Sequence, residues 1–488
     1  MGIAAQNLLV IMSDEHSVKT LGCYGSRVAR TPHLDALAAR GTRFASAYCC
    51  NPVCIPARAT FATGLYTHQV GYWDNADPYD GATPSWHHHL RDRGHRVDAI
   101  GKLHFRCTDD DNGFSAERIP MHVIDGKGDL MGLIRADLPE RKGAYKMAAM
   151  AGPGESMYTR YDRDIAAAAQ VWLHEEAARH RDRPWVLFVS FVAPHFPLTA
   201  PAEYFYEYYE SDHLPWPKLY AHEQRPDHPF VRDYANSFVY DRHFDNQDKV
   251  RRAVAGYYGL CTFLDEQIGK VLAALASTGL AGSTRVVYTS DHGDNLGSRG
   301  LWGKSTLYEE AAAVPLIVAG DGVPSGHVVE HHASHVDFWP FVFEATGEQM
   351  PPPMDHPFPG TSLFALARGA RPERTILSEY HGMGSTTGAF MVRLEQYKYV
   401  HYVNYPAQFF DLHEDPEELV DRASDPGMRP AMREARGRLA AMLDPVQVDA
   451  RAKARQAHLL ALNGGREAVI ARGDLGFSVP PGVTPMFD

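Results

Sequence analysis

Cys54 and Arg58 are the residues whose types and spacing most suggest chemistry, within Cys54-Ile55-Pro56-Ala57-Arg58. A cysteine near the start of a helix, with a cation one turn later, is a candidate nucleophile, because positive charge and a helix N-terminus lower the pKa of a thiol. The alternative is that Cys54 is an ordinary buried cysteine and that Arg58 pairs with an acid. On this pentapeptide alone, the second interpretation is slightly favoured.

Acidic, basic and imidazole side chains also follow four short apolar runs. Such runs are typical of buried strands in a parallel sheet, and ligands bind at the carboxyl ends of these strands. We therefore expect the four strand ends to converge on one cleft. They are Ser13-Asp14 after Asn7–Met12, Gly101-Lys102-Leu103-His104 after Val97–Ile100, Ala193-Pro194-His195 after Trp185–Val192, and Ser290-Asp291-His292 after Arg285–Thr289.

Helical segments alternate with these strands. Helical spacing of apolar residues occurs in Thr31–Arg40, Ser85–Arg93, Ile165–Ala178, Val254–Leu275 and Val336–Thr346. This alternation predicts an α/β fold with a mostly parallel sheet sandwiched by helices.

The pattern changes beyond Gly369. Phe390–Val392 and Tyr397–Val403 alternate like an antiparallel pair, and a helix is expected near Met428–Leu443. We predict a catalytic domain over residues 1–370, a small C-terminal α+β subdomain over 371–445, and a tail over 446–488 that is long enough to reach another subunit. Two long irregular stretches, 109–156 and 200–246, are expected to build a substrate rim.

Composition and charge exclude several classes of function. The chain has 488 residues and a net charge of −12, so it lacks the basic stripe that nucleic-acid backbones require. A small anionic substrate would instead need a locally positive pocket. No apolar run approaches the length of a membrane span. The six scattered cysteines do not form a disulfide pattern, and we expect a cytoplasmic protein.

Two groups of histidines are interpreted as non-catalytic. His87, His88 and His89 are consecutive, so they cannot converge on one metal, and they are assigned to an amphipathic helix. His331, His332 and His335 could form an i, i+4 pair, but they have no evident carboxylate partner and are assigned to the surface.

Several motifs in a fixed order resemble the sulfatase family of the alkaline phosphatase superfamily. The Cys-x-Pro-x-Arg pattern at Cys54 matches the family motif in which cysteine is oxidised to formylglycine. The others are NLLVIMSD, TPHLDALAARGTRF, GKLH, APH, SDHGDNLG, GKSTLYEE and FFDLHEDPEE. The branch with the closest resemblance contains choline sulfatases, bacterial arylsulfatases and phosphonate monoester hydrolases, and it implies an alkaline-phosphatase-like fold.

The resemblance implies one divalent metal, bound by Asp14, Asp291, His292 and the residue derived from Cys54. Carboxylates alone suit Ca²⁺, whereas an imidazole ligand favours Mn²⁺ mildly. Either metal remains open.

The resemblance also implies the catalytic roles. Hydrated formylglycine at position 54 would attack sulfur, form a covalent sulfate ester, and release sulfate with the help of its second hydroxyl. His104 matches the base of that second step, and His195 and Lys304 match the groups that contact sulfate and protonate the leaving oxygen. Lys102 and Arg58 match groups that hold the formylglycine. Asn75 matches a substrate-facing amide.

These residues predict a metal-dependent hydrolase of sulfate monoesters that also acts on phosphate or phosphonate esters. The main alternative is a phosphonate monoester or phosphodiester hydrolase, which the Asp-plus-His metal set suits, while Lys102 and His104 are closer to the sulfatase pattern. Choline sulfatase is a second alternative. An inactive binding protein is a remote one, since it would have lost catalytic positions. The expected partners are a small anionic ester, a formylglycine-generating enzyme and further copies of the chain, as a dimer or tetramer.

Overall fold

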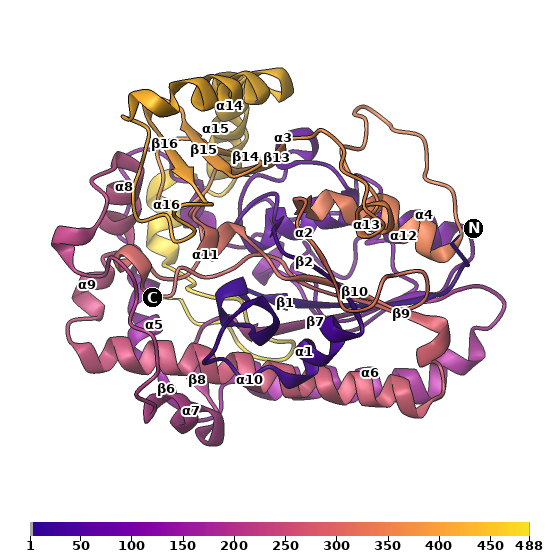
Figure 1. The fold of residues 1–488 in the computed structure, drawn as a ribbon. Helices are drawn as coiled ribbons and strands as arrows, with labels where there is room; N and C mark the ends of the chain where they lie inside the picture. The colour runs from indigo at the N-terminus through magenta and orange to yellow at the C-terminus, as the bar shows by residue number, and fades with distance from the viewer. Residues whose placement is uncertain (1–2, 488) are drawn as a thin grey trace.

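A computed structural model describes residues 3–487, and an eight-stranded sheet forms its centre (Figure 1). The strand order is β11-β2-β10-β9-β1-β7-β4-β5. The strands from β9 to β5 in this order are parallel, whereas β10 runs antiparallel to both of its neighbours. The bounds are β1 (Asn7–Asp14), β2 (Gly41–Phe44), β4 (Val97–Lys102), β5 (Ala116–Met121), β7 (Val186–Pro194), β9 (Thr284–Ser290), β10 (Leu316–Ala319) and β11 (His327–Val329). The predicted fold class is confirmed.

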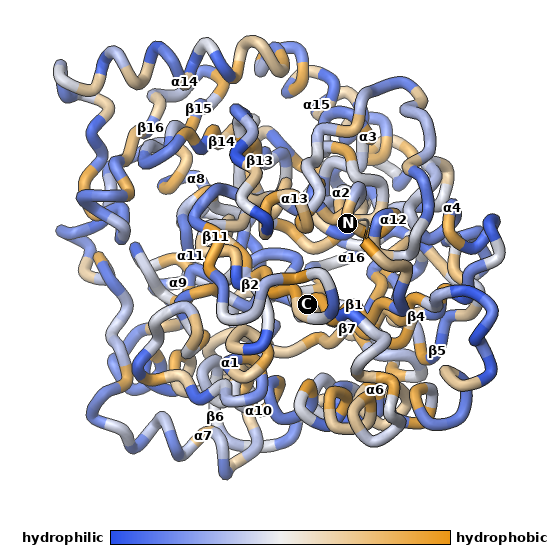
Figure 2. Tube along the Cα trace, turned by 45° about the vertical axis from the view of Figure 1, so that its right-hand side comes forward, coloured by the Kyte–Doolittle hydropathy of each residue, from blue (hydrophilic) through white to orange (hydrophobic). Residues whose placement is uncertain are grey.

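The central strand β1 is covered on both faces, which explains its continuous apolar sequence. Leu8, Val10 and Met12 pack in one hydrophobic cluster, and Leu9 and Ile11 pack in another. Helices α2 (Cys54–Thr63), α4 (Trp86–Asp92), α12 (Phe338–Thr346) and α13 (Leu363–Ala367) contribute to the first cluster. Helices α1 (Pro32–Ala39), α6 (Met157–Val171) and α10 (Gln247–Ser277) contribute to the second. Figure 2 shows the apolar course of β1 and β7 inside a more polar periphery.

The helices α6 and α10 begin earlier than the apolar pattern predicts, because polar side chains cap them. Ser156 Oγ accepts a hydrogen bond from the Thr159 amide at 3.1 Å, and Asn246 Oδ1 accepts one from the Lys249 amide at 3.0 Å. The predicted helix that contains His87–His89 is α4. The surface assignment of His335 is wrong: it is 2% exposed, and its ring centroid lies 5.6 Å from that of Phe61.

The C-terminal unit is built on a four-stranded antiparallel sheet, which contains the two predicted strands and two more. The strands are β13 (Ile376–Tyr380), β14 (Ala389–Leu394), β15 (Tyr397–Tyr402) and β16 (Tyr405–Asp411). Helix α14 (Arg429–Met442) contacts β14 and β15, close to where a helix was predicted.

The tail consists of α15 (Pro445–Leu462), α16 (Gly465–Arg472) and an extended segment, coloured yellow in Figure 1. It lies against its own chain, where it reaches the cleft at the strand ends. The two irregular stretches contain short helices, α5 (Tyr145–Ala149), α7 (Ala202–Tyr209), α8 (Pro229–Phe238) and α9 (Tyr240–His243).

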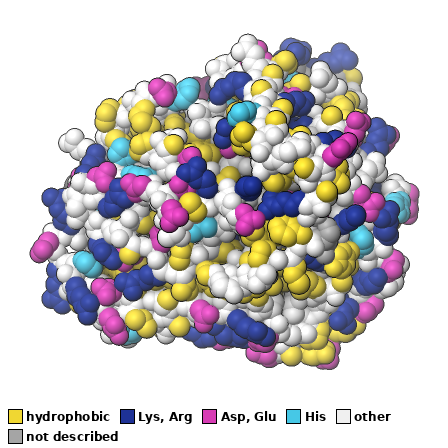
Figure 3. Space-filling model, turned by 180° about the vertical axis from the view of Figure 1, so that it is seen from behind, with side chains coloured by type: hydrophobic (Ala, Val, Ile, Leu, Met, Phe, Trp, Pro, Cys, Tyr) yellow, Lys and Arg dark blue, Asp and Glu magenta, His cyan; other side chains and the backbone are white. Residues whose placement is uncertain are grey.

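Basic and acidic side chains are interspersed on the face shown in Figure 3. Among the described residues, no helix combines the length and apolar character needed to cross a membrane.

Candidate active site

The four predicted strand ends meet in one place. The strands β9, β1, β7 and β4 are consecutive neighbours in the sheet, so the residues at or just after their carboxyl ends lie side by side. Asp14, Lys102, His195 and Asp291 are all buried there. The predicted convergence is confirmed, and it follows from parallel strands sharing one direction.

Cys54 is the first residue of α2 and faces these strand ends. Its Sγ lies 3.0 Å from Lys304 Nζ, 3.2 Å from His292 Nε2 and 3.7 Å from Asp14 Oδ1. Burial, and then the charge of Asp14, raise the pKa of the Cys54 thiol to about 11, although Lys304 opposes the change. The unmodified side chain is therefore not the low-pKa thiolate considered from the sequence.

Arg58 does not activate the thiol but holds the acids. Its Nε donates to Asp291 Oδ2 at 2.8 Å and its Nη2 to Asp14 Oδ2 at 3.2 Å. Its Nη1 donates to the Lys102 carbonyl at 2.7 Å and to Ser190 Oγ at 2.9 Å. Because the guanidinium is planar and fixed by four partners, it sets the positions of two carboxylates at once.

Four buried side chains form a candidate metal centre: Asp14, Cys54, Asp291 and His292. One donor atom from each lies within 4.8 Å of all the others. His292 Nδ1 lies 2.9 Å from the Gly293 carbonyl, so this nitrogen carries the proton and leaves Nε2 free to bind a cation. The donor set fits a divalent metal.

Lys102 adds positive charge beside this centre. Its Nζ lies 2.6 Å from Asp14 Oδ2. Against the effect of burial, the charges of Lys102, Lys304 and Arg58 hold the pKa of Asp14 well below its usual value. Asp14 is therefore ionised, as a metal ligand must be.

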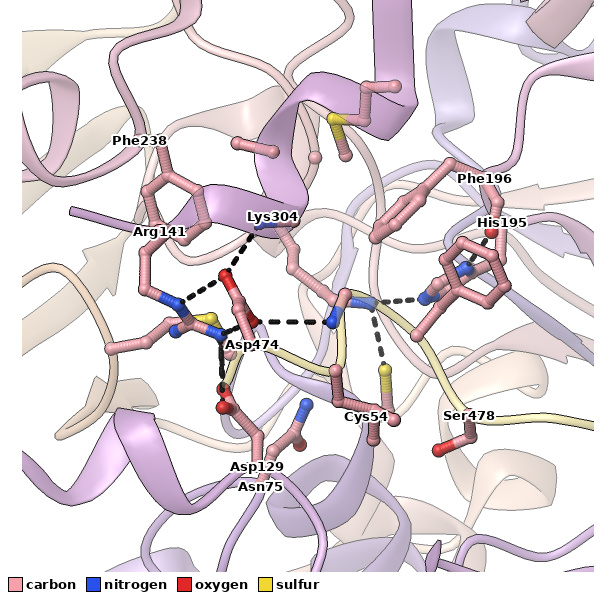
Figure 4. Close-up of a pocket in the computed structure, with 18 of the residues that line it drawn as sticks. Cys54, Asn75, Asp129, Arg141, His195, Phe196, Phe238, Lys304, Asp474 and Ser478 are labelled. Carbon is pink, nitrogen blue, oxygen red and sulfur yellow. Dashed lines mark hydrogen bonds and ion pairs between the residues drawn. The ribbon is translucent and has the colours of Figure 1, made fainter. Parts of the chain in front are cut away.

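Lys304 and His195 form a pair on the other side of Cys54 (Figure 4). Lys304 Nζ lies 2.8 Å from His195 Nε2, and Glu15 Oε2 lies 3.3 Å from both nitrogens. Burial and the charge of Lys304 hold the pKa of His195 well below 6.5, so the imidazole is neutral. Against burial, Cys54, Glu15 and Asp14 raise the pKa of Lys304. The shared proton therefore resides on the lysine.

His104 and Asn75 also line the pocket. His104 Nε2 lies 2.7 Å from Ser478 Oγ, and burial, with Lys102, holds the pKa of His104 well below its usual value. Asn75 Oδ1 accepts a hydrogen bond from the Ile55 amide at 3.1 Å. Asn75 therefore also fixes the start of α2, a role that the sequence did not suggest.

The pocket as a whole encloses about 800 Å³ of space between its atoms, open solvent included, and most of its lining is apolar. Met147, Tyr234, Phe238 and Tyr240 come from the two irregular stretches, so these stretches build the rim as predicted. Phe196 and Phe477 complete the aromatic lining.

Sequence reasoning missed a second polar cluster in this pocket. Arg141 Nη2 donates to Asp129 Oδ1 and to Asp474 Oδ1, both at 2.9 Å (Figure 4). Arg141 and Asp474 are 333 positions apart and follow no motif, so no signal in the sequence joins them.

Known proteins resemble most of the chain. A choline-sulfatase of Rhizobium meliloti (strain 1021) is 31% identical over 431 residues, which cover 86% of this chain and 83% of that protein. Arylsulfatase K of Homo sapiens is 27% identical over 444 residues, with 86% and 79% covered. A crystal structure of phosphonate monoester hydrolase of Agrobacterium radiobacter shares the fold, with a TM-score of 0.70, 22% identity, and 92% and 96% of the two chains covered.

Two family models match overlapping parts of the sequence. The model described as N-sulphoglucosamine sulphohydrolase, C-terminal, matches residues 297–444. The Sulfatase model matches residues 6–348, a range that holds the metal centre, the Lys304–His195 pair and His104. With most of its length and all of these side chains inside that match, the chain belongs to the sulfatase family and is a hydrolase.

Proposed function

We propose that this sulfatase cleaves sulfate monoesters of small alcohols or phenols, and that residue 54 is the nucleophile after conversion to formylglycine. The observation that carries the proposal is the position of Cys54, which lies between the donor atoms of the metal centre and the Lys304–His195 pair. A nucleophile at this position has cationic groups on both sides of the transferred group. Formylglycine there would supply one hydroxyl for attack and a second for release of the sulfate.

A divalent metal held by Asp14, Asp291, His292 and residue 54 would act as a Lewis acid and make the nucleophile reactive near neutral pH. One imidazole among the carboxylates favours Mn²⁺ over Ca²⁺. Ion pairs with Arg58 and Lys102 hold these carboxylates in place.

Lys304 and His195 would protonate the leaving oxygen. The proton is held on Lys304 Nζ, 2.8 Å from His195 Nε2, so Lys304 would deliver it and His195 would position it. Because His195 is neutral and Lys304 is charged, the pair would present a positive charge to the ester.

His104 would act as the base of the second step. Its pKa is low, so the imidazole is neutral and can accept a proton. Asn75, which accepts a hydrogen bond from the Ile55 amide at the start of α2, would contact the substrate.

Charge rather than sulfur-specific geometry dominates this end of the pocket, which supports side activity on phosphate and phosphonate esters. A phosphonate monoester hydrolase is the second candidate, because His292 joins the acids at the metal centre and a hydrolase of that kind shares the fold. Choline sulfate is the third, suggested by the 31% identical relative.

The test is a paired steady-state assay of an aryl sulfate, an aryl phosphonate monoester and choline sulfate. The proposal expects the highest kcat/KM for the aryl sulfate, and a preference for the phosphonate ester would replace it by the second candidate. Cytoplasmic location, a dimer or tetramer, and maturation by a formylglycine-generating enzyme stay predictions.

A further inference from the structure

The C-terminal tail makes contacts inside the catalytic pocket. Residues 474–478, here called the strap, follow α16 and line the cavity beside Cys54, with Asp474 and Ser478 visible in Figure 4. The strap lies beyond residues 348 and 444, where the two family matches end.

One end of the strap is held by charge. Asp474, 2% exposed, accepts hydrogen bonds from Arg141 Nε at 3.1 Å and from Arg141 Nη2 at 2.9 Å. The Gly143 amide donates to Asp474 Oδ2 at 3.0 Å. A buried arginine that is shared with Asp129 therefore ties the strap to the rim.

The fit between strap and rim is also one of shape. A Cβ on Gly143 would lie 3.0 Å from Gly476 Cα and 3.2 Å from Asp474 Cγ. Gly476 itself has φ of +73°, a left-handed conformation that favours glycine. Two glycines thus allow the backbones to approach closely.

The other end of the strap packs next to the catalytic histidines. The Phe477 ring centroid lies 5.8 Å from that of Tyr158 and 5.9 Å from that of Phe196, whose ring stacks on His195. Tyr158 Oη donates to the Ser478 carbonyl, and Ser478 Oγ bonds to His104.

We propose that the strap is the specificity-determining wall of the pocket. It limits the organic half of the substrate to a compact, mainly apolar alcohol or phenol, bound between Phe477 and the aromatic rim, and it excludes extended groups such as sugar chains. This inference rests on the proposed function. Its basis is that Phe477, Phe238 and Tyr240 line the same cavity as Cys54 and Lys304.

The test compares phenyl sulfate with biphenyl-4-yl sulfate, two esters whose leaving groups have similar acidity but different length. Phe477→Ala should raise kcat/KM for the long ester relative to the short one by about tenfold or more, since pocket contacts of this size discriminate on that scale. Tyr206→Ala is the matched control, because Tyr206 is an exposed aromatic (46%) on α7 outside the cavity lining.

Gly143→Ala provides a second variant, which displaces the strap without removing a side chain from the pocket. It should change the ratio in the same direction. Thermal unfolding of each variant shows whether it folds. If both folded variants keep the wild-type ratio, the inference is wrong.

A wild type that hydrolyses neither ester would contradict the proposed function but not the strap. Calorimetric binding of the same two esters to unconverted protein separates the two failures. The inference then expects the ratio of the two Kd values to shift by about tenfold in Phe477→Ala, and an unchanged ratio would overturn it.

Discussion

Two histidines within one small pocket are assigned to different halves of the reaction. His195 is paired with Lys304, whereas His104 bonds to Ser478 on the tail. Burial lowers the pKa of both imidazoles, so both side chains are neutral near pH 7.

His195→Ala should slow esters with poor leaving groups by on the order of 10²–10⁴, because the departing oxygen then lacks half of its proton-donating pair. An activated aryl sulfate, whose phenolate leaves without a proton, should be affected far less. Steady-state rates over a series of leaving groups measure this. His327→Ala, at an exposed position on β11, is the control. Equal losses for every leaving group would contradict the assignment.

His104→Ala should instead block the second half of the reaction. We expect a burst of about one equivalent of phenol per active site, followed by slow turnover, as a blocked second step requires. Rapid-mixing kinetics with an aryl sulfate show the burst. A uniformly slow reaction without a burst would remove His104 from this role.

The carboxyl ends of the sheet strands hold the side chains of the candidate active site. Apolar runs that end in Asp or His revealed β1, β7 and β9 in the sequence, because burial on both faces leaves few other residue types. The strand pattern could therefore predict the sheet and the convergence of its strand ends, whereas the resemblance to the sulfatase family supplied the candidate metal ligands. The sequence could not predict the strap, since Arg141 and Asp474 are 333 positions apart and meet only through tertiary packing.

Helix capping and burial explain the smaller differences between the predicted and the observed structure. The helices α6 and α10 extend to polar caps that apolar periodicity does not register. His335 was assigned to the surface because it has no carboxylate partner, but aromatic packing against Phe61 and a 3.4 Å contact between its Nε2 and Thr289 Oγ1 accommodate it in the interior.

Asp14→Ala and Asp291→Ala should each remove bound metal and activity together, because each deletes one carboxylate ligand from a strand end. Metal analysis of the purified variants, with assays before and after chelation of the wild type, measures both effects. Asp245→Ala, an exposed acid paired with Lys249, is the control. Full activity in metal-free protein would show that these strand ends do not form a metal centre.

At the scale of the whole molecule, buried charges join the C-terminal sheet to the catalytic domain. Lys398 of β15 is fully buried, and its Nζ lies 3.0 Å from Glu309 Oε1 and 2.8 Å from Glu418 Oε1. Glu309 begins α11 (Glu309–Ala312), which follows the Lys304 loop. The C-terminal unit thus contacts the segment that follows Lys304 in the chain.

Lys398→Ala should lower the free energy of unfolding by about 3–5 kcal/mol, because it leaves the buried Glu418 and the partly buried Glu309 without the cation they share. Urea unfolding monitored by circular dichroism measures the change. Lys249→Ala, which breaks an exposed pair, should cost less than about 1 kcal/mol. Equal small effects in both variants would mean that the buried cluster does not hold the two units together.

The proposed reaction depends on the conversion of residue 54 to formylglycine. The measurement is the rate of aryl sulfate hydrolysis by wild type and by Cys54→Ala, both produced with a formylglycine-generating enzyme, with the rate normalised to the converted fraction found by peptide mass spectrometry. The account predicts that the wild-type rate rises in proportion to the converted fraction, and that the folded Cys54→Ala variant has no turnover. Substantial hydrolysis by Cys54→Ala, or a wild-type rate independent of conversion, would contradict it.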